Sequence, residues 1–415
     1  MLEKKMHGIT LIALVVTIVV LLILAGITIS LVFSDNGIIK KAQEAANKTK
    51  EAVINEQTQM NEIADYMENM LNEIGGTIPD EPEGPEMPEG WDDTKVDAVE
   101  SEDNVVVPVP KGYTASEVTG ENTVKDGFVI YENTNGEDKY EPVTDESDIE
   151  TAQTTRNQFV WVPVANPSDM YGTDKDGKKW GKTYYYVDAN TIVPFYWKEQ
   201  NGTMIIEDIE GYREPDVIDE DSSNNVTIIQ LETEFNNMIE SVEKYGGFYI
   251  GRYETGNLSQ SEAVVVKNNT DIGDQTWYTM YNKSKGVAAN SNVTTTMIWG
   301  CQWDAVLRWM YNSGDEEKKT YTYDSTGKGN YYGTNGNEAI PTGSNDAYAV
   351  NNIYDMAGNV YENTMGIVGS SNEGGKVARG GNYDGEPISS SVSFYAAFTG
   401  LFSNSKIGSR LALYM

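Results

Sequence analysis

The stretch NNIYDMAGNVYENT, residues 351–364, carries a strong turn signal at its centre. Gly358 and Asn359 stand together there, and both residue types tolerate the positive φ angles that a tight backbone turn requires. Further along, RGGN (379–382) supplies two glycines where strands can approach closely. The simplest interpretation of both stretches is that they maintain a fold rather than perform chemistry.

The sequence around these stretches, from about Trp91 to Met415, alternates short β-like runs with turn residues. The β-like runs are NVVVPVP (104–110), DGFVIYE (126–132), NQFVWVPV (157–164) and GGFYIGRYE (246–254). Apolar residues recur at helical spacing in LETEFNNMIESVEKYGG (231–247) and MIWGCQWDAVLRWMYNSG (297–314). Many strands with few helices predict an irregular α+β domain over 93–415, with a surface insertion at about 183–225.

Four motifs follow one another along this domain: GGFYIGRYETG (246–256), NNIYDMAGNVYENT (351–364), RGGN (379–382) and IGSRLAL (407–413). The series resembles the formylglycine-generating, sulfatase-modifying-factor family, whose domain has a C-type-lectin-like fold and whose usual strings are close to GxYEVT, DMxGNVWEW, RGGSW and GFRL. The chain departs from that pattern at Tyr361, where Trp is usual, and at Ser409, where Phe is usual. We expect Arg410, next to Ser409, to bind internal carbonyls or a carboxylate.

The residues for the family's chemistry are missing. The resemblance implies two copper-binding cysteines shortly after the RGG string, but that region reads NYDGEPISSSVSFYAAF (382–398). The chain has one cysteine, Cys301, and one histidine, His7. A single thiol cannot replace a pair of thiolate ligands for copper, and we interpret Cys301 as a small buried residue on a helix. We call the domain 93–415 the head, and we therefore expect it to be non-catalytic and to require no cofactor.

A calcium site is the one metal site that the resemblance still implies. Glu362, in the string GNVYE, matches a glutamate that binds calcium in the family. A carboxylate beside backbone carbonyls suits this ion. The alternative is a structural glutamate without a metal.

The segment between RGGN and the last strand has no charge between Pro387 and Lys406, yet it is rich in aromatic residues. Aromatic anchors among Ser, Ala, Gly and Asn resemble an antibody binding surface. The arrangement also resembles the variable proteins of diversity-generating retroelements. Both resemblances imply a face that binds a protein or glycan ligand, although each aromatic could equally be a core residue. The candidate contact residues are Tyr383, Asp384, Phe394, Tyr395, Phe398, Phe402 and Asn404.

The N-terminus predicts a membrane anchor, because residues 9–33 contain no charge and exceed the roughly 20 residues that span a bilayer. MLEKKMHG (1–8) before this segment resembles the leader of type IV pilins and pseudopilins, which a prepilin peptidase cuts after Gly8. The cut would leave Ile9 as the first residue and remove the histidine. Ala13 stands where the family usually has the Glu that supports filament assembly. The sequence therefore fits a minor or tip subunit, or a simple membrane-anchored protein, as well as it fits a major pilin.

A stalk and a spacer are predicted between anchor and head. In 34–74, apolar residues recur at alternating steps of three and four, which is typical of a coiled-coil seam that could self-associate. In the linker 75–92, prolines recur at every third position from Pro79 to Pro88, as in a stiff polyproline II spacer. The seam could pack on a sister helix, in a filament or on the head.

The net charge of −34 disfavours nucleic acid as a partner. Together these features predict a single-pass membrane protein with an extracellular head, carried on the cell surface or on a pilus, that recognises a ligand or mediates adhesion. Two alternatives remain open: an oxidase of the formylglycine-generating type or a relative, and a structural minor pilin whose head is passive.

Overall fold

The computed structural model describes residues 85–133, 142–173, 176–194, 196–200, 203–207, 226–287, 290–368 and 375–415. The chain divides into two units, 1–83 and 84–415, and every described residue belongs to the second. The predicted leader with its Gly8–Ile9 cut, the membrane segment 9–33, the stalk 34–74 and the start of the linker lie outside the described residues. Within the ranges given above, no helix is both long and apolar enough to cross a membrane.

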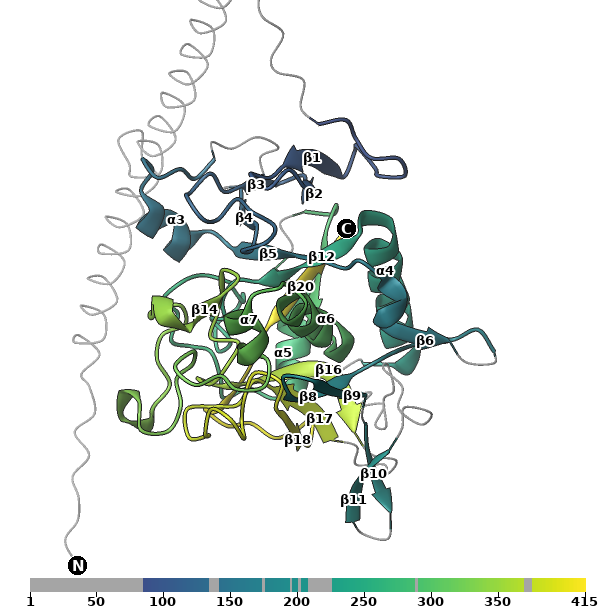
Figure 1. The fold of residues 1–415 in the computed structure, drawn as a ribbon, viewed down its shortest axis with the longest axis vertical. Coiled ribbons are helices and arrows are strands. Elements are labelled where there is room, and N and C mark those ends of the chain that lie inside the picture. Colours follow the sequence, from purple (N-terminus) through teal and green to yellow (C-terminus); the bar gives the residue numbers. More distant parts are fainter. Residues whose placement is uncertain are drawn as a thin grey trace, which may run out of the picture. The chain divides into compact units, whose positions relative to one another are not determined.

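Two larger sheets organise the described part of the head (Figure 1). The first is antiparallel throughout, in the order β13 (Thr294–Met297), β20 (Leu411–Tyr414), β12 (Gly247–Gly251), β5 (Gln158–Pro163), β4 (Val129–Glu132), β3 (Tyr113–Ala115). The second has the order β18 (Tyr395–Phe398), β17 (Gly375–Arg379), β16 (Tyr361–Val368), β19 (Ile407–Ser409), and only its β16–β19 pair is parallel. The four predicted strand runs contribute β2, β4, β5 and β12, which confirms them.

Side chains of the first sheet alternate between two apolar cores, as the two-residue period of a strand requires. In β5, Val160 and Val162 belong to one buried cluster, while Phe159 and Trp161 belong to the other. Both faces of this sheet are therefore covered, which fixes its register.

Short hairpins complete the strands: β1 (Val96–Glu100) with β2 (Val106–Pro110), β6 (Tyr171–Thr173) with β7 (Lys179–Gly181), β8 (Tyr184–Asp188) with β9 (Thr191–Pro194), β10 (Tyr196–Gln200) with β11 (Thr203–Glu207), and β14 (Ala349–Val350) with β15 (Ile353–Tyr354). The β8–β9 hairpin stands at the N-terminal end of the surface insertion expected at about 183–225. Thr183 and Tyr186 are buried, and the Tyr186 hydroxyl donates to the Asp304 carbonyl at 3.3 Å. Tyr186 therefore packs the hairpin against the core, while Val187 and Ile192 of the same hairpin are exposed.

The helices are α3 (Ile149–Thr155), α4 (Ile228–Tyr245), α5 (Trp277–Ser284), α6 (Gly300–Tyr311) and α7 (Glu316–Tyr321), with 3-10 turns at Pro167–Asp169, Asn335–Asn337 and Asp346–Tyr348. Both predicted helices are confirmed as α4 and α6. The Thr227 hydroxyl caps the start of α4 by accepting from the N–H of Gln230, and Gly246 ends this helix at φ 79°. The mixture of sheets and helices confirms the α+β class.

Helix α6 joins the two sheets, because it contacts β5 of the first and β16 of the second. Cys301 is buried on this helix, as the sequence predicted. Trp303 and Met310 are also buried there. One element therefore connects the first sheet with the strands that carry the predicted ligand-binding residues.

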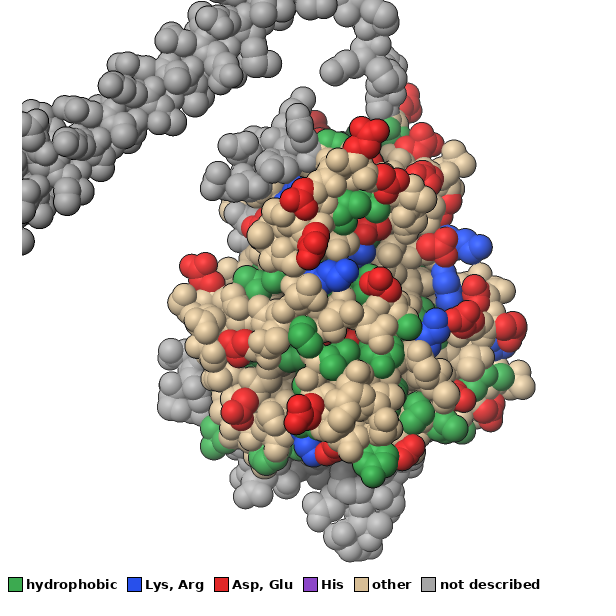
Figure 2. Space-filling model, turned by 90° about the vertical axis from the view of Figure 1, so that its left-hand side faces the viewer, with side chains coloured by type: hydrophobic (Ala, Val, Ile, Leu, Met, Phe, Trp, Pro, Cys, Tyr) green, Lys and Arg blue, Asp and Glu red, His purple; other side chains and the backbone are tan. Residues whose placement is uncertain are grey.

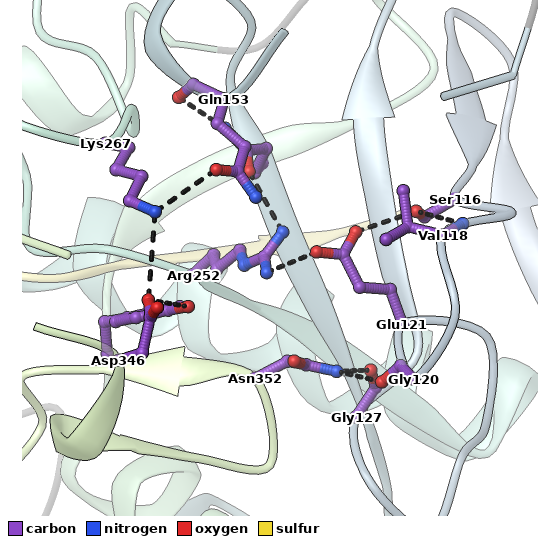
Figure 3. A network of polar contacts seen from close by, with 12 residues as sticks. Ser116, Val118, Gly120, Glu121, Gly127, Gln153, Arg252, Lys267, Asp346 and Asn352 are labelled. Carbon is purple, nitrogen blue, oxygen red and sulfur yellow. Dashed lines mark hydrogen bonds and ion pairs between the residues drawn. The ribbon is translucent and has the colours of Figure 1, made fainter. Parts of the chain in front are cut away.

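A buried polar network ties the N-terminal part of the head to β12 (Figure 3). Arg252, just after β12, donates to Glu121 at 2.5 Å and to the side-chain oxygen of Gln158 at 3.2 Å. Glu121 also accepts from the hydroxyl of Ser116 at 2.7 Å. Because both charges are buried and paired, this contact fixes the segment before β4 against the first sheet.

Candidate ligand-binding face

The sequence motifs meet in the core at Arg410, which lies between β19 and β20. Its guanidinium donates to both carboxylate oxygens of Glu362, with 2.8 Å from Nε to Oε2 and 2.5 Å from Nη2 to Oε1. It also donates to the carbonyls of Gly251 at 2.9 Å and Tyr354 at 2.7 Å. Both charged side chains are fully buried. The prediction that Arg410 binds a carboxylate and internal carbonyls is confirmed.

This arrangement favours the structural alternative for Glu362 over calcium. Both oxygens of Glu362 already bind Arg410, and a divalent cation on them would face the guanidinium charge at close range. Over the part of the chain that the structure describes, no three His, Cys, Asp or Glu side chains are grouped to hold a metal ion. Glu362 is therefore an ion-pair partner in this fold.

Two further buried carboxyl groups interact with this pair. Glu254 accepts from the side-chain amide of Asn359 at 2.7 Å. Asp355 accepts from the N–H of Gly343 at 2.6 Å and from the Thr342 hydroxyl at 3.2 Å. Burial raises the pKa of both carboxyl groups, that of Asp355 to about 6, and the nearby charges of Asp355 and Glu362 raise the pKa of Glu254 further. These groups hold the motif loops in place beneath the surface.

An aromatic cluster joins the start of β16, where Tyr361 lies, to the end of β18 and the turn that follows it. The ring of Tyr361 lies 6.0 Å from that of Phe394 and 5.8 Å from that of Phe398. Phe398 and Phe402 stack with centroids 5.4 Å apart. Phe402 is 43% exposed and its neighbour Leu401 is 70% exposed. We call Tyr361, Phe394, Phe398 and Phe402 the aromatic patch.

Polar side chains border the aromatic patch. Lys406 forms an ion pair with Asp384, and its ammonium lies 5.5 Å from the ring centroid of Tyr383. The hydrogen bond with Asp384 raises the pKa of Lys406. The side-chain oxygen of Asn404 accepts from the backbone N–H of Lys406 at 2.9 Å, so Asn404 shapes the turn that carries this lysine.

Tyr395 lies differently from the other candidates. Its ring is 4.0 Å from the guanidinium carbon of Arg379, and its hydroxyl oxygen is closed to solvent. Arg379 in turn donates to Asp304 on α6 at 2.9 Å, and both of these side chains are buried. Tyr395 therefore covers a buried ion pair, and any contact with a ligand would involve the outer part of its half-buried ring.

The structure brings the predicted contact residues into neighbouring positions, while their role in binding stays a prediction. Tyr361, Leu401 and Lys406 belong to the same surface and were missed by the sequence reasoning. The signal for Tyr361 was its departure from the usual Trp at the start of a strand. No pattern in the sequence marked Leu401 and Lys406, because the positions of these two residues depend on how the turn after β18 folds back toward β16.

Gly381 sets the path of the loop that carries Tyr383 and Asp384. Its φ is +77°, and a Cβ there would lie 2.1 Å from the Ser390 carbonyl oxygen. Gly333 is also left-handed, at φ +82°, but a Cβ there meets nothing within 4 Å. We expect Gly381→Ala to lower the free energy of unfolding by about 1–3 kcal/mol more than Gly333→Ala, because of the added overlap. Urea unfolding of the two variants measures this difference, and equal losses would contradict it.

Comparison with known proteins supports the assignment of this region. Residues 287–415 match the family model of the sulfatase-modifying factor enzyme 1-like domain. This C-terminal region is a sulfatase-modifying factor-like domain with a C-type-lectin-like fold. It contains three of the four motifs, and its last strand, β20, pairs with β12 of the remaining motif, GGFYIGRYETG (246–256), through Tyr249–Leu413 and Ile250–Ala412. The first sheet therefore extends beyond the matched residues.

Similarity to whole proteins is weaker. A search of curated proteins gave no match. Three solved structures each align with 41% of this chain. The crystal structure of CarF aligns over 87% of its own length, with 15% sequence identity and a TM-score of 0.32. Variable protein 1 of Treponema denticola has TM-score 0.30, 15% identity and 85% covered. PvdO from Pseudomonas aeruginosa has TM-score 0.28, 18% identity and 82% covered.

Proposed function

We propose that the chain is a surface-displayed recognition protein whose sulfatase-modifying factor-like head binds a protein or glycan through the aromatic patch, without catalysis. The stacked Phe398–Phe402 pair, with Leu401 exposed beside it, carries the proposal. Apolar side chains gathered at a surface are a common mark of a contact site. Aromatic rings suit this task because they bury a large area at a low cost in conformational entropy.

The surroundings of the aromatic patch suggest that its side chains can be substituted without loss of the fold. Within the described ranges, β18 pairs with β17 alone and forms the edge of its sheet. Its middle residues, Ala396 and Ala397, are small. The buried ion pairs of Arg379 and Arg410 do not use the side chains of the patch, although Glu362 follows Tyr361 directly on β16. Substitutions in the patch should therefore alter recognition more than stability.

The charge of the surface limits the class of ligand. Figure 2 shows acidic side chains over much of one face, with hydrophobic ones mainly in its middle and lower parts and few basic ones. The chain as a whole carries −34. Polyanions would be repelled, so we propose a neutral or basic protein surface, or an uncharged glycan.

The residues available for catalysis support a binding role over the oxidase alternative. The chain's one cysteine, Cys301, lines a cavity together with Met170, whose thioether is also a soft ligand. A thiol with a thioether is still not the pair of thiolates that the family resemblance implies for copper. Copper bound by the purified chain, with oxidation of a cysteine-containing peptide, would favour the oxidase instead.

Surface display is the part of the proposal that rests on sequence alone. Residues 9–33 would anchor the chain after prepilin peptidase cuts between Gly8 and Ile9, and residues 34–74 would project the head. Placement of the head outside the cell gives the aromatic patch access to ligands on other surfaces.

Adhesion of cells that produce the full chain tests binding and display together. We expect Phe398→Ser/Phe402→Ser to lower adhesion at least tenfold on the surface to which wild-type cells adhere best, chosen from a panel of cell types and immobilised glycans. Loss of two central aromatic contacts removes the kind of side chain that dominates binding energy. Protease treatment of intact cells should remove the head and abolish adhesion.

Ile229→Ser provides the matched control, because Ile229 is 73% exposed on α4, away from the second sheet. This variant should adhere like wild type. Circular dichroism of both variants checks that the heads remain folded. Unchanged adhesion of the folded double variant would reject the aromatic patch as the binding face, and adhesion that survives protease treatment would reject display.

A further inference from the structure

A cavity of about 360 Å³ opens between α6, the end of β5 and the 3-10 turn Pro167–Asp169. α6 presents Cys301, Ala305 and Arg308 to it, at the three- and four-residue spacing of one helix face. None of its lining residues belongs to the aromatic patch or its polar border. The cavity is therefore a separate feature, to which the proposed function assigns no role.

The size and walls of the cavity suit a flat apolar molecule. Val164, Met170 and Ala305 contribute apolar surface, and Trp309 adds an indole ring. An engineered cavity of about 150 Å³ in another protein binds one benzene ring. A volume of about 360 Å³ therefore accommodates two fused rings with a small substituent. It also falls within the range of natural small-molecule sites.

The rim of the cavity is polar but carries no net charge. Arg308 lies 2.9 Å from Asp169 in an ion pair, and its guanidinium carbon is 4.5 Å from the ring centroid of Tyr184. Arg308 is the one cationic side chain among the residues that line the cavity, and these contacts already pair it. Asn166 and Asn312 add amide groups that can donate to or accept from a ligand. A charged ligand would have to break the ion pair, whereas a neutral polar group need only meet the amides.

We infer that this cavity is a binding site for a neutral two-ring aromatic or heteroaromatic molecule whose polar substituent contacts the amides at the rim. The rings lie against Trp309 and the apolar wall, and Cys301 lines the same cavity. Burial of both rings supplies most of the affinity.

Cys301 makes the site directly testable, because it is the chain's single cysteine and lines the cavity. The experiment uses the full chain, with 2-naphthamide as the probe. Saturation-transfer NMR should show contact with the naphthyl protons. Saturating 2-naphthamide should also slow the alkylation of Cys301 by iodoacetamide at least fivefold, as followed by intact mass. The anion 2-naphthoate should bind at least tenfold more weakly, because Asp169 already pairs with Arg308.

Ala305→Leu fills the cavity and should weaken 2-naphthamide binding at least tenfold. Ala347→Leu makes the same change at an exposed site in the turn Asp346–Tyr348 and should leave binding unchanged. If Cys301 resists alkylation in the folded chain, the NMR comparison of the two variants decides. Absence of saturation transfer in the wild type, or equal affinity of Ala305→Leu and wild type, overturns the site. Tighter binding of 2-naphthoate overturns the assignment to neutral ligands.

Discussion

Arg410→Met should lower the free energy of unfolding of the head by about 3–5 kcal/mol, the usual cost of removing one partner from a buried ion pair. The loss is large because Glu362 would keep its charge in the core without a partner. The carbonyls of Gly251 and Tyr354 would lose their donors as well. Urea unfolding of the full chain, followed by tryptophan fluorescence, measures the change.

Two further variants separate the ion pair from a general effect of the substitution. Lys406→Met also removes a cation, but its pair with Asp384 is solvent-exposed, so we expect a loss of about 1 kcal/mol or less. Arg410→Met/Glu362→Leu removes both buried charges and should recover part of the stability lost in Arg410→Met. The prediction fails if Arg410→Met and Lys406→Met destabilise the head equally.

The fold was predictable from sequence where the pattern is local. The β-like run NQFVWVPV and the helical spacing from Leu231 to Val242 depend on neighbouring residues alone, and both are confirmed. Pairing between distant strands was not predictable in this way. The order β13-β20-β12-β5-β4-β3 brings the last strand between two others that lie more than a hundred residues earlier, and nothing in the local pattern specifies that placement.

The candidate site shows the same limit. The aromatic content between Pro387 and Lys406 marked the segment, but it did not distinguish Tyr395 from Phe398. The two residues lie at opposite ends of β18, where Tyr395 covers Arg379 and Phe398 joins the surface cluster. For Glu362 the sequence left calcium and a structural role open, and it could not show that the partner of this carboxylate, Arg410, lies 48 residues away. A sequence motif identifies a carboxylate that could bind a metal, but it does not show which side chain of the protein already pairs with that carboxylate.

Asp355→Asn should change the pH dependence of stability. Burial raises the pKa of Asp355 from 3.8 to about 6, so the folded head binds this proton more tightly than the unfolded chain does. The proton therefore stabilises the fold fully below about pH 4, and this contribution is lost as the pH rises through about 6. A shift of about two pKa units corresponds to at most about 3 kcal/mol. Between pH 4 and pH 7, the stability of Asp355→Asn relative to wild type should rise by up to that amount.

The comparison is made by urea unfolding of both proteins at several pH values, taking the difference at each pH so that titrating groups that do not interact with Asp355 cancel. The titration of Glu254 remains in the difference, because the charge of Asp355 raises its pKa. Asp315→Asn serves as the opposite case. The backbone N–H groups of Lys318 and Glu317 lower the pKa of Asp315, so its carboxylate stabilises the fold at neutral pH and the contribution is lost on acidification. The relative stability of Asp315→Asn should therefore fall as the pH rises from 3 to 6. A difference between Asp355→Asn and wild type that stays constant from pH 4 to pH 7 would show that Asp355 is not held protonated in the core.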